Sequence, residues 1–89
     1  PRGAWRMRNL ELAAPLSGND VLDTLRAQHV LFAPDRRHGI LPINFNLDPE
    51  GLVRKGQFLA VADDLPACRQ LFTTVLESLP IQWRYTRDR

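Results

Sequence analysis

The sequence predicts an α+β domain in which two helices pack on one face of an antiparallel β-sheet, forming a two-layer sandwich. Three observations indicate this fold class. Apolar and polar side chains alternate in three segments, which is the pattern of half-buried strands, and a fourth segment is apolar on both faces, as in a central strand. Two further segments carry apolar side chains at helical spacing. The chain has 89 residues, 44% of them apolar, so we expect a single folded domain over residues 1–89.

The first strand is expected over residues 5–14. Trp5 and Met7 alternate with arginines, and the two leucines that follow continue the alternation with its parity shifted by one residue. A β-bulge at Arg8–Asn9 would account for that shift. We expect the strand to end at Pro15, where the backbone N–H is missing.

The first helix is expected to begin at Ser17–Asp20 and to run to Gln28 or His29. A serine or asparagine side chain there can accept a hydrogen bond from the exposed amides of the first turn. Val21, Leu22 and Leu25 form its apolar face. The short apolar run over residues 30–32 fits either a strand or a packed connector.

The next strand is expected over residues 41–46, after a turn at residues 34–39. Leu41, Ile43 and Phe45 alternate with polar residues and with a proline. Pro42 cannot donate to a ladder of backbone hydrogen bonds. The segment with Pro42, Asn44 and Asn46 is therefore predicted to be an edge strand.

Residues 48–51 have the proline and glycine of a type I turn, which predicts a hairpin. Its second strand, residues 57–62, is apolar on both faces and is predicted to be central. A second helix follows, capped by Asp63 or Asp64 with a proline in its first turn, and it ends at Pro80. Its apolar stripe comprises Leu65, Cys68, Leu71, Phe72, Val75, Leu76 and Leu79.

The last strand is expected over residues 81–86, which completes the order β-α-β-β-α-β. This order is that of the ferredoxin-like arrangement, in which the first and last strands are neighbours. We expect the paired terminal strands to direct their aromatic and sulfur side chains inward and their polar ones outward. The inward set is Trp5, Met7, Trp83 and Tyr85, and the outward set is Arg6, Arg8, Gln82, Arg84 and Thr86.

The sequence offers no catalytic constellation. Cys68 lies on the apolar stripe of the second helix and is expected to be a buried, inert thiol. His29 and His38 fall at a helix end and in a turn, and no cluster has the spacing of metal ligands. Asp63 and Asp64 are accounted for by helix capping. We therefore expect no enzymatic activity, no cofactor and no metal.

One enzymatic alternative comes from Pro1. The chain resembles, at this residue alone, tautomerases of the small β-α-β superfamily, which use an amino-terminal proline as general base. The resemblance implies a tautomerase-like activity as a remote alternative. In that family the proline leads directly into an apolar strand, whereas Arg2-Gly3-Ala4 intervene here.

Composition constrains the partners only weakly. The net charge is +2, and eleven arginines stand against one lysine, Lys55, which either reflects the base composition of the genome or equips a surface for carboxylate or phosphate. No apolar run is long enough to span a membrane, and the single cysteine forms no intrachain disulfide, so we expect a soluble cytoplasmic protein. Because the chain begins with proline, we expect it to be methionine-processed or part of a longer protein.

These observations predict a non-catalytic protein-binding or oligomerisation module, an accessory domain of a larger protein. The alternative is RNA or single-stranded DNA binding through an arginine-bearing sheet face. RNA-recognition motifs share the order of elements, although only part of their aromatic signature is found, at Arg54–Val61. The residues expected to form the binding surface are Arg6, Arg8, Gln82, Arg84, Arg36 and Arg37.

Overall fold

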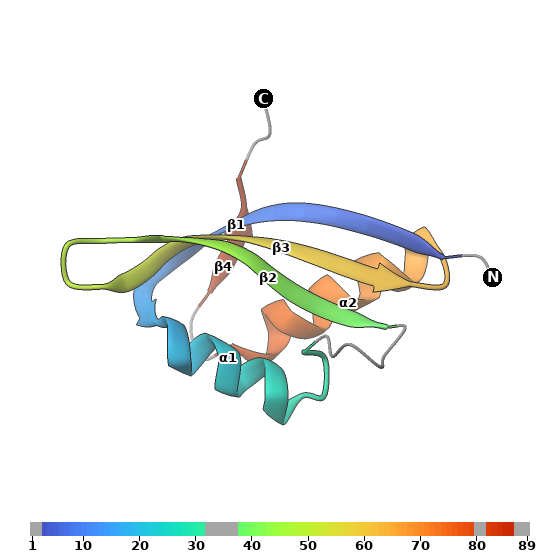
Figure 1. Ribbon diagram of the computed structural model, residues 1–89, viewed down its shortest axis with the longest axis horizontal. Helices are drawn as coiled ribbons and strands as arrows, with labels where there is room; N and C mark the ends of the chain where they lie inside the picture. The colour runs from blue at the N-terminus through green and yellow to red at the C-terminus, as the bar shows by residue number, and fades with distance from the viewer. Residues whose placement is uncertain (1–2, 32–37, 80–81, 87–89) are drawn as a thin grey trace.

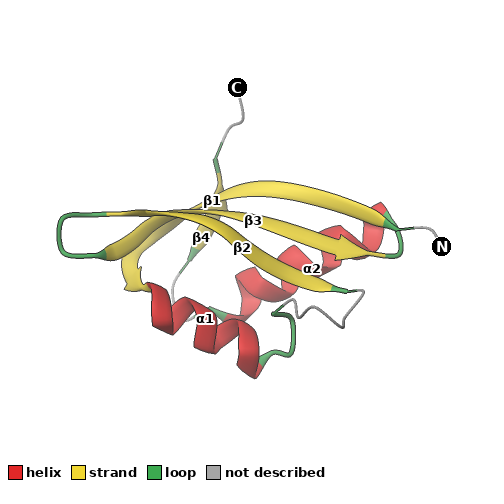
Figure 2. Ribbon diagram, in the orientation of Figure 1, coloured by secondary structure: helices red, strands yellow, loops and turns green. Residues whose placement is uncertain are grey.

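The computed structural model describes residues 3–31, 38–79 and 82–86, and it shows an α+β domain with a four-stranded antiparallel sheet and two helices (Figure 1). Both helices lie on the same side of the sheet and leave its other side uncovered (Figure 2). The elements in chain order are β1 (Ala4–Ser17), α1 (Gly18–Ala27), β2 (Gly39–Leu47), β3 (Leu52–Ala62), α2 (Leu65–Ser78) and β4 (Trp83–Tyr85).

The strands are arranged in the order β2-β3-β1-β4, and all three neighbouring pairs are antiparallel. β1 and β3 are the two inner strands, and β2 and β4 are at the ends of the sheet. The first and last strands of the chain are therefore neighbours. β3 begins at Leu52, five residues earlier than predicted, because the hairpin strands remain paired almost to the turn.

The predicted bulge at Arg8–Asn9 is wrong. β1 pairs with β3 without interruption from Ala4 to Glu11, and the irregularity lies between Glu11 and Leu16. The strand also passes through Pro15 and ends only at Ser17. Pro15 is tolerated because it lies in this irregular stretch, where no ladder partner is assigned to it.

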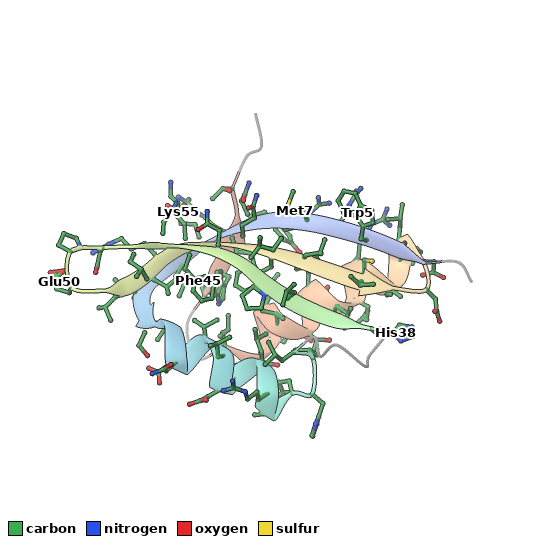
Figure 3. All side chains as sticks on the ribbon, in the orientation of Figure 1. Trp5, Met7, His38, Phe45, Glu50 and Lys55 are labelled. Atoms are coloured by element: carbon green, nitrogen blue, oxygen red, sulfur yellow. The ribbon has the colours of Figure 1, made fainter. Side chains whose placement is uncertain are left out.

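A bulge lies instead in β2, where the register with β3 shifts between Pro42 and Asn44. Ile43 is the extra residue. Because of it, Ile40 and Phe45 both face the helices although an odd number of steps separates them. Figure 3 shows Phe45 on the helix side of the sheet. The predicted alternation, with Leu41, Ile43 and Phe45 on one face, is therefore wrong for Phe45.

The residues before β2 were predicted to be a strand or a connector. They form a single parallel bridge, between Leu31 and Ile40, and the Ile40 amide donates to the Val30 carbonyl. α1 has already ended at Ala27, and His29 takes a positive φ of 58°. This segment therefore covers only the first residues of β2. The predicted turn at residues 34–39 falls largely outside the described residues.

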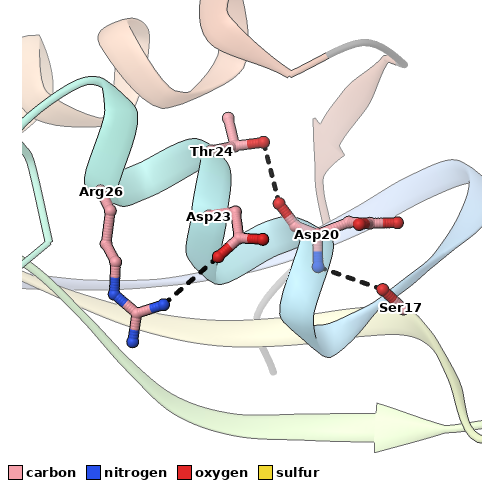
Figure 4. A network of polar contacts seen from close by, with 5 residues as sticks. All are labelled: Ser17, Asp20, Asp23, Thr24 and Arg26. Atoms are coloured by element: carbon pink, nitrogen blue, oxygen red, sulfur yellow. Dashed lines mark hydrogen bonds and ion pairs between the residues drawn. The ribbon is translucent and has the colours of Figure 1, made fainter.

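α1 begins as predicted. The Asp20 amide donates to Ser17 Oγ at 3.1 Å, so that the serine caps the first turn. Thr24 Oγ1 donates to the Asp20 carbonyl, and Arg26 forms an ion pair with Asp23 at 3.3 Å (Figure 4). These contacts are exposed, and they fix the helix start rather than the core.

α2 is capped by Asp64, whose Oδ1 accepts from the Ala67 amide at 2.9 Å. Pro66 lies in the first turn, where its missing N–H costs nothing. Asp63, the other predicted cap, lies with its Oδ1 3.0 Å from His38 Nε2. The helix ends at Ser78, two residues before Pro80, where the sequence predicted its end.

The core lies between the sheet and the two helices, and β3 supplies the residue at its centre. Phe58 is fully buried, and its ring lies 5.8 Å from the Phe45 ring and 5.5 Å from the Trp83 ring. Gly56 makes room for these rings. A Cβ atom there would lie 2.7 Å from Phe58 Cε1 and 3.1 Å from Phe45 Cδ1. The other buried apolar residues are Leu10, Leu12, Val21, Leu25, Val30, Ile40, Val53, Ala60, Ala62, Cys68, Phe72, Val75 and Leu79.

We expect Gly56→Ala to destabilise the domain by about 1–3 kcal/mol, because the added methyl group overpacks the aromatic cluster. Gly18→Ala is the matched control, since its Cβ would meet no atom closer than 3.8 Å and should change the free energy of unfolding by less than about 0.5 kcal/mol. Urea unfolding of both variants measures the difference. Equal stabilities would show that the rings move aside at no cost.

Candidate functional site

The uncovered face of the sheet is the candidate functional site. One half of this face is apolar, and most of its side chains belong to the two inner strands, β1 and β3. In the register of β1 and β3, Trp5 is paired with Val61 and Met7 with Leu59. The side chains at these positions lie opposite the buried face, because their neighbours Ala60 and Ala62 belong to the core. Figure 3 shows Trp5 and Met7 standing on the side of the sheet away from the helices.

β2 adds two more apolar side chains to this face. Leu41 is paired with Leu59, and the bulge places Ile43 over the same region. Trp5 is 64% exposed, Ile43 47%, and Met7 and Leu41 39% each. We define the apolar patch as Trp5, Met7, Leu41, Ile43, Leu59 and Val61. Part of it, together with Gly3 and Ala4, forms a shallow depression of about 550 Å³.

The other half of the open face is polar. Asn9, Gln57 and Asn44 form one row across the sheet, because Gln57 pairs with both asparagines. They line a depression of about 300 Å³ whose remaining walls come from Asn46, Lys55, Gly56 and Thr86. Primary amides both donate and accept hydrogen bonds, so this half can form directional contacts without a strong charge.

A row of three charged side chains lies across the sheet at the end of the polar half. Glu11 lies between Lys55 on β3 and Arg84 on β4. Arg84 donates from Nε and from Nη2 to Glu11 Oε1, at 2.8 and 2.6 Å. These hydrogen bonds lower the pKa of Glu11, and the positive charges of Arg84 and Lys55 lower it further. The arginine on the open face is thus already paired with a carboxylate.

The structure does not bring the predicted arginine surface together on one face. Arg6 and Arg8 share the parity of the buried Leu10 and lie on the helix side of β1. Arg84 is on the open face, and Gln82, just before β4, lines a depression with it and Glu11. Arg36 and Arg37 lie outside the described residues. The expectation that Trp5 and Met7 point inward is wrong, whereas Trp83 and Tyr85 do contact the helix side.

The signal that could have found the apolar patch is the parity of β1. Leu10 and Leu12 are buried, and two-residue steps back from Leu10 reach Arg8 and Arg6, not Met7 and Trp5. The predicted bulge at Arg8–Asn9, which would have put Trp5 and Met7 on the same face as Leu10, is not formed. The long arginine stems can instead lie along apolar surface at the margin of the core while their charged ends reach water.

The predicted edge-strand residues are found on β2, at one end of the sheet. Asn44 and Asn46 are exposed on the open face, where they line the polar depression. Pro42 is opposite the buried Phe58 and is half-buried. Pro42, which lacks a backbone N–H, is therefore part of a strand at the end of the sheet. In the described part of the chain, no further strand lies beside the outer side of β2.

The described residues do not bring metal-ligating side chains together. They contain no group of three or more His, Cys, Asp and Glu side chains that could hold a metal ion. None of the described helices is long and apolar enough to cross a membrane. Cys68 is buried against β1 and β3, where Sγ donates to the Ala4 carbonyl at 3.5 Å, and burial raises the pKa of its thiol. Pro1 lies outside the described residues.

We expect Arg84→Gln to raise the pKa of Glu11 toward its ordinary value, because the strongest stabilisation of the carboxylate is removed. Since the pKa is lowered in the folded state, the pair stabilises the fold above the ordinary carboxyl pKa, and this contribution is lost as pH falls through the lowered value. Carboxyl ¹³C shifts followed against pH measure the change. Arg26→Gln on α1 should leave Glu11 unaffected, and an equal shift in both variants would contradict the assignment.

Cys68 should react slowly with a thiol–disulfide exchange reagent as long as the domain is folded. The thiol is buried and its pKa is raised, so little thiolate is exposed to the reagent. We expect labelling at least about tenfold slower in buffer than in urea. Equal rates under both conditions would mean that the β1–α2 contact opens freely.

Comparison with known proteins adds no relative: no protein-family model matches this chain, and searches of the curated proteins and of the solved structures return no match.

Proposed function

We propose that this domain is a non-catalytic protein-binding module that assembles with a second copy of itself through the open face of its sheet. The observation that carries the proposal is the apolar patch, which joins six apolar side chains from β1, β2 and β3 on one uncovered surface. Monomeric proteins rarely leave contiguous apolar surface of this kind exposed to water. The domain can act as an accessory unit of a larger protein.

Covering the apolar patch lowers the free energy of the system. Burial of apolar surface contributes about 25 cal/mol per Å². Trp5 offers the largest share, since 64% of its surface is exposed and tryptophan is among the residues most enriched in interface hot spots. Met7 next to it is flexible and polarizable, so it can adapt to an opposing surface.

A second copy suits this surface because the depression in the patch is lined by apolar residues and glycine without a charged side chain. Two copies can therefore meet face to face without bringing like charges together. A two-fold axis in the interface, across the strands between the Trp5 and Met7 rows, would place Trp5 of one copy against Met7 of the other. The paired charges of Glu11 and Arg84 would then lie toward the rim.

The arrangement supports the ferredoxin-like assignment as part of this proposal. The elements follow one another as β-α-β-β-α-β, β1 and β4 are antiparallel neighbours, and both helices cover one face. An arrangement of this type leaves the other face of the sheet available for contacts.

Nucleic-acid binding remains the alternative, but the arginine-bearing open face that it requires is not formed by the described residues. Arg84 is paired with Glu11, and Arg6 and Arg8 lie on the opposite side of the sheet. Among the described residues, the large exposed aromatic on the open face is Trp5, on an inner strand. Stacking of bases commonly uses more than one such side chain.

We expect Trp5→Ser to weaken self-association at least about tenfold, because it removes the largest side chain of the patch. Leu47→Ser is the matched control. Leu47 is also exposed, at 60%, but it does not line the patch, so dimerisation should be unchanged. Sedimentation equilibrium over a series of protein concentrations gives both dissociation constants.

Two results would count against this proposal. A wild-type domain that stays monomeric at every concentration would exclude assembly through the open face. Dimers that Trp5→Ser and Leu47→Ser affect equally would place the interface elsewhere. A single-stranded oligonucleotide that binds the domain, with an affinity that falls steeply with salt, would favour the nucleic-acid alternative.

A further inference from the structure

A second surface lies at the edge of β1, on the side where β4 is its neighbour. β1 has 14 residues and β4 has three. The two strands pair only from Leu10 to Leu12. In the described part of the chain, no strand lies beside residues 4–8 at this edge.

The backbone groups at this edge are directed outward. The Thr86 amide donates to the Asn9 carbonyl and the Ala13 amide donates to the Gln82 carbonyl, both at 2.9 Å. Because alternate residues of a strand direct their peptide groups to the same side, Met7 and Trp5 direct theirs to this edge as well. The Met7 carbonyl accepts from its neighbour Arg8 Nη1 at 3.2 Å, an exposed contact that a backbone donor can replace.

A groove of about 540 Å³ lies between this edge and α2. Arg6 and Arg8 of β1 form one wall, and Arg69 and Thr73 of α2 form the other, above the buried ring of Phe72. Tyr85 and Thr86 close the end where β4 stops, and the Tyr85 ring meets the Phe72 ring edge to face at 6.5 Å. The groove is thus partly aromatic and bounded by a strand edge and a helix.

The groove is positively charged. Among the described residues, three arginines line it and no carboxylate does. The ion pairs among the described residues do not involve Arg6, Arg8 or Arg69. Arg8 lies over the Tyr85 ring, 5.9 Å from its centroid. Arg6 Nε is shielded from water and has no hydrogen-bond partner among the described residues.

We propose that this groove binds an extended acidic segment of a partner protein, which adds to the sheet as a strand beside residues 4–8 of β1. The added strand runs antiparallel to β1, in line with β4, and its carboxylates meet the three arginines. The charged groove is on the other side of the sheet from the apolar patch, and its charge complementarity with an acidic segment does not depend on self-association. A nucleic acid could meet the charges but would not pair with the strand edge, so a peptide is favoured.

The position of the groove on one face of the sheet determines which residues of the bound segment must be acidic. Side chains of the added strand alternate between the two faces, and those in line with Arg6 and Arg8 face the groove. Acidic residues are therefore required at alternate positions. The residues between them lie on the open face beside Trp5 and Met7, where apolar side chains fit.

The test compares two short blocked peptides of the same composition. In one, Glu and Val alternate, and in the other the Glu residues and the Val residues form separate blocks. We expect the alternating peptide to bind about fivefold more tightly, because only it can direct all its carboxylates into the groove. Binding is followed by amide shifts in two-dimensional NMR, and the Trp5 and Met7 amides should become protected from hydrogen exchange.

Arg69→Glu should weaken binding of the alternating peptide about tenfold, because it reverses a charge on the groove wall. Arg69 is exposed on a helix surface, as is Arg26 on α1, so Arg26→Glu is the matched control and should have no effect. Equal affinity for the two peptides, or protection that omits Trp5 and Met7, would overturn the proposal. So would a single-stranded oligonucleotide that displaces the peptide and binds more tightly.

Discussion

The uninterrupted pairing of β1 with β3 is the constraint on which the rest of the structure depends. Once Leu10 occupies the core, every second residue of β1 is committed to the same side, back to Ala4. Trp5 and Met7 must then face away from the helices, whatever their hydrophobicity. The open face is therefore apolar at Trp5 and Met7 because the burial of Leu10, farther along β1, determines which side each residue of the strand faces.

Two local features, a glycine in β3 and a bulge in β2, allow these strands to pack against the core beside β1. Gly56 leaves space for two phenylalanine rings, and the extra residue Ile43 returns Phe45 to the helix side after Leu41 has faced outward. The bulge also brings Ile43 over the open face next to Leu59 and Val61. The bulge at Ile43 thus has two effects: it places Phe45 against the core, and it enlarges the apolar patch.

Much of the fold could be predicted from the sequence because its signals are local. The caps at Ser17 and Asp64 and the apolar run that becomes the central part of β3 each depend on a few neighbouring residues. The faces of β1 could not be predicted in this way. Whether the arginines or the aromatic side chains turn inward depends on α2, which lies more than 50 residues away in the sequence and leaves room at its margin for the stems of Arg6 and Arg8. The apolar patch was missed for the same reason, because the parity of Leu10 indicates it only when that leucine is buried and β1 runs without a bulge.

The short length of β4 has a consequence for the solubility of the domain. A strand edge that lacks a neighbour is a template on which identical chains can stack into fibrils. Arg6 and Arg8 stand on the stretch of β1 that has no neighbouring strand at this edge in the described part of the chain, so an approaching copy of the same edge meets a row of identical positive charges. The two arginines thereby act as gatekeepers that keep the edge from pairing with itself while leaving it accessible to a chain of opposite charge.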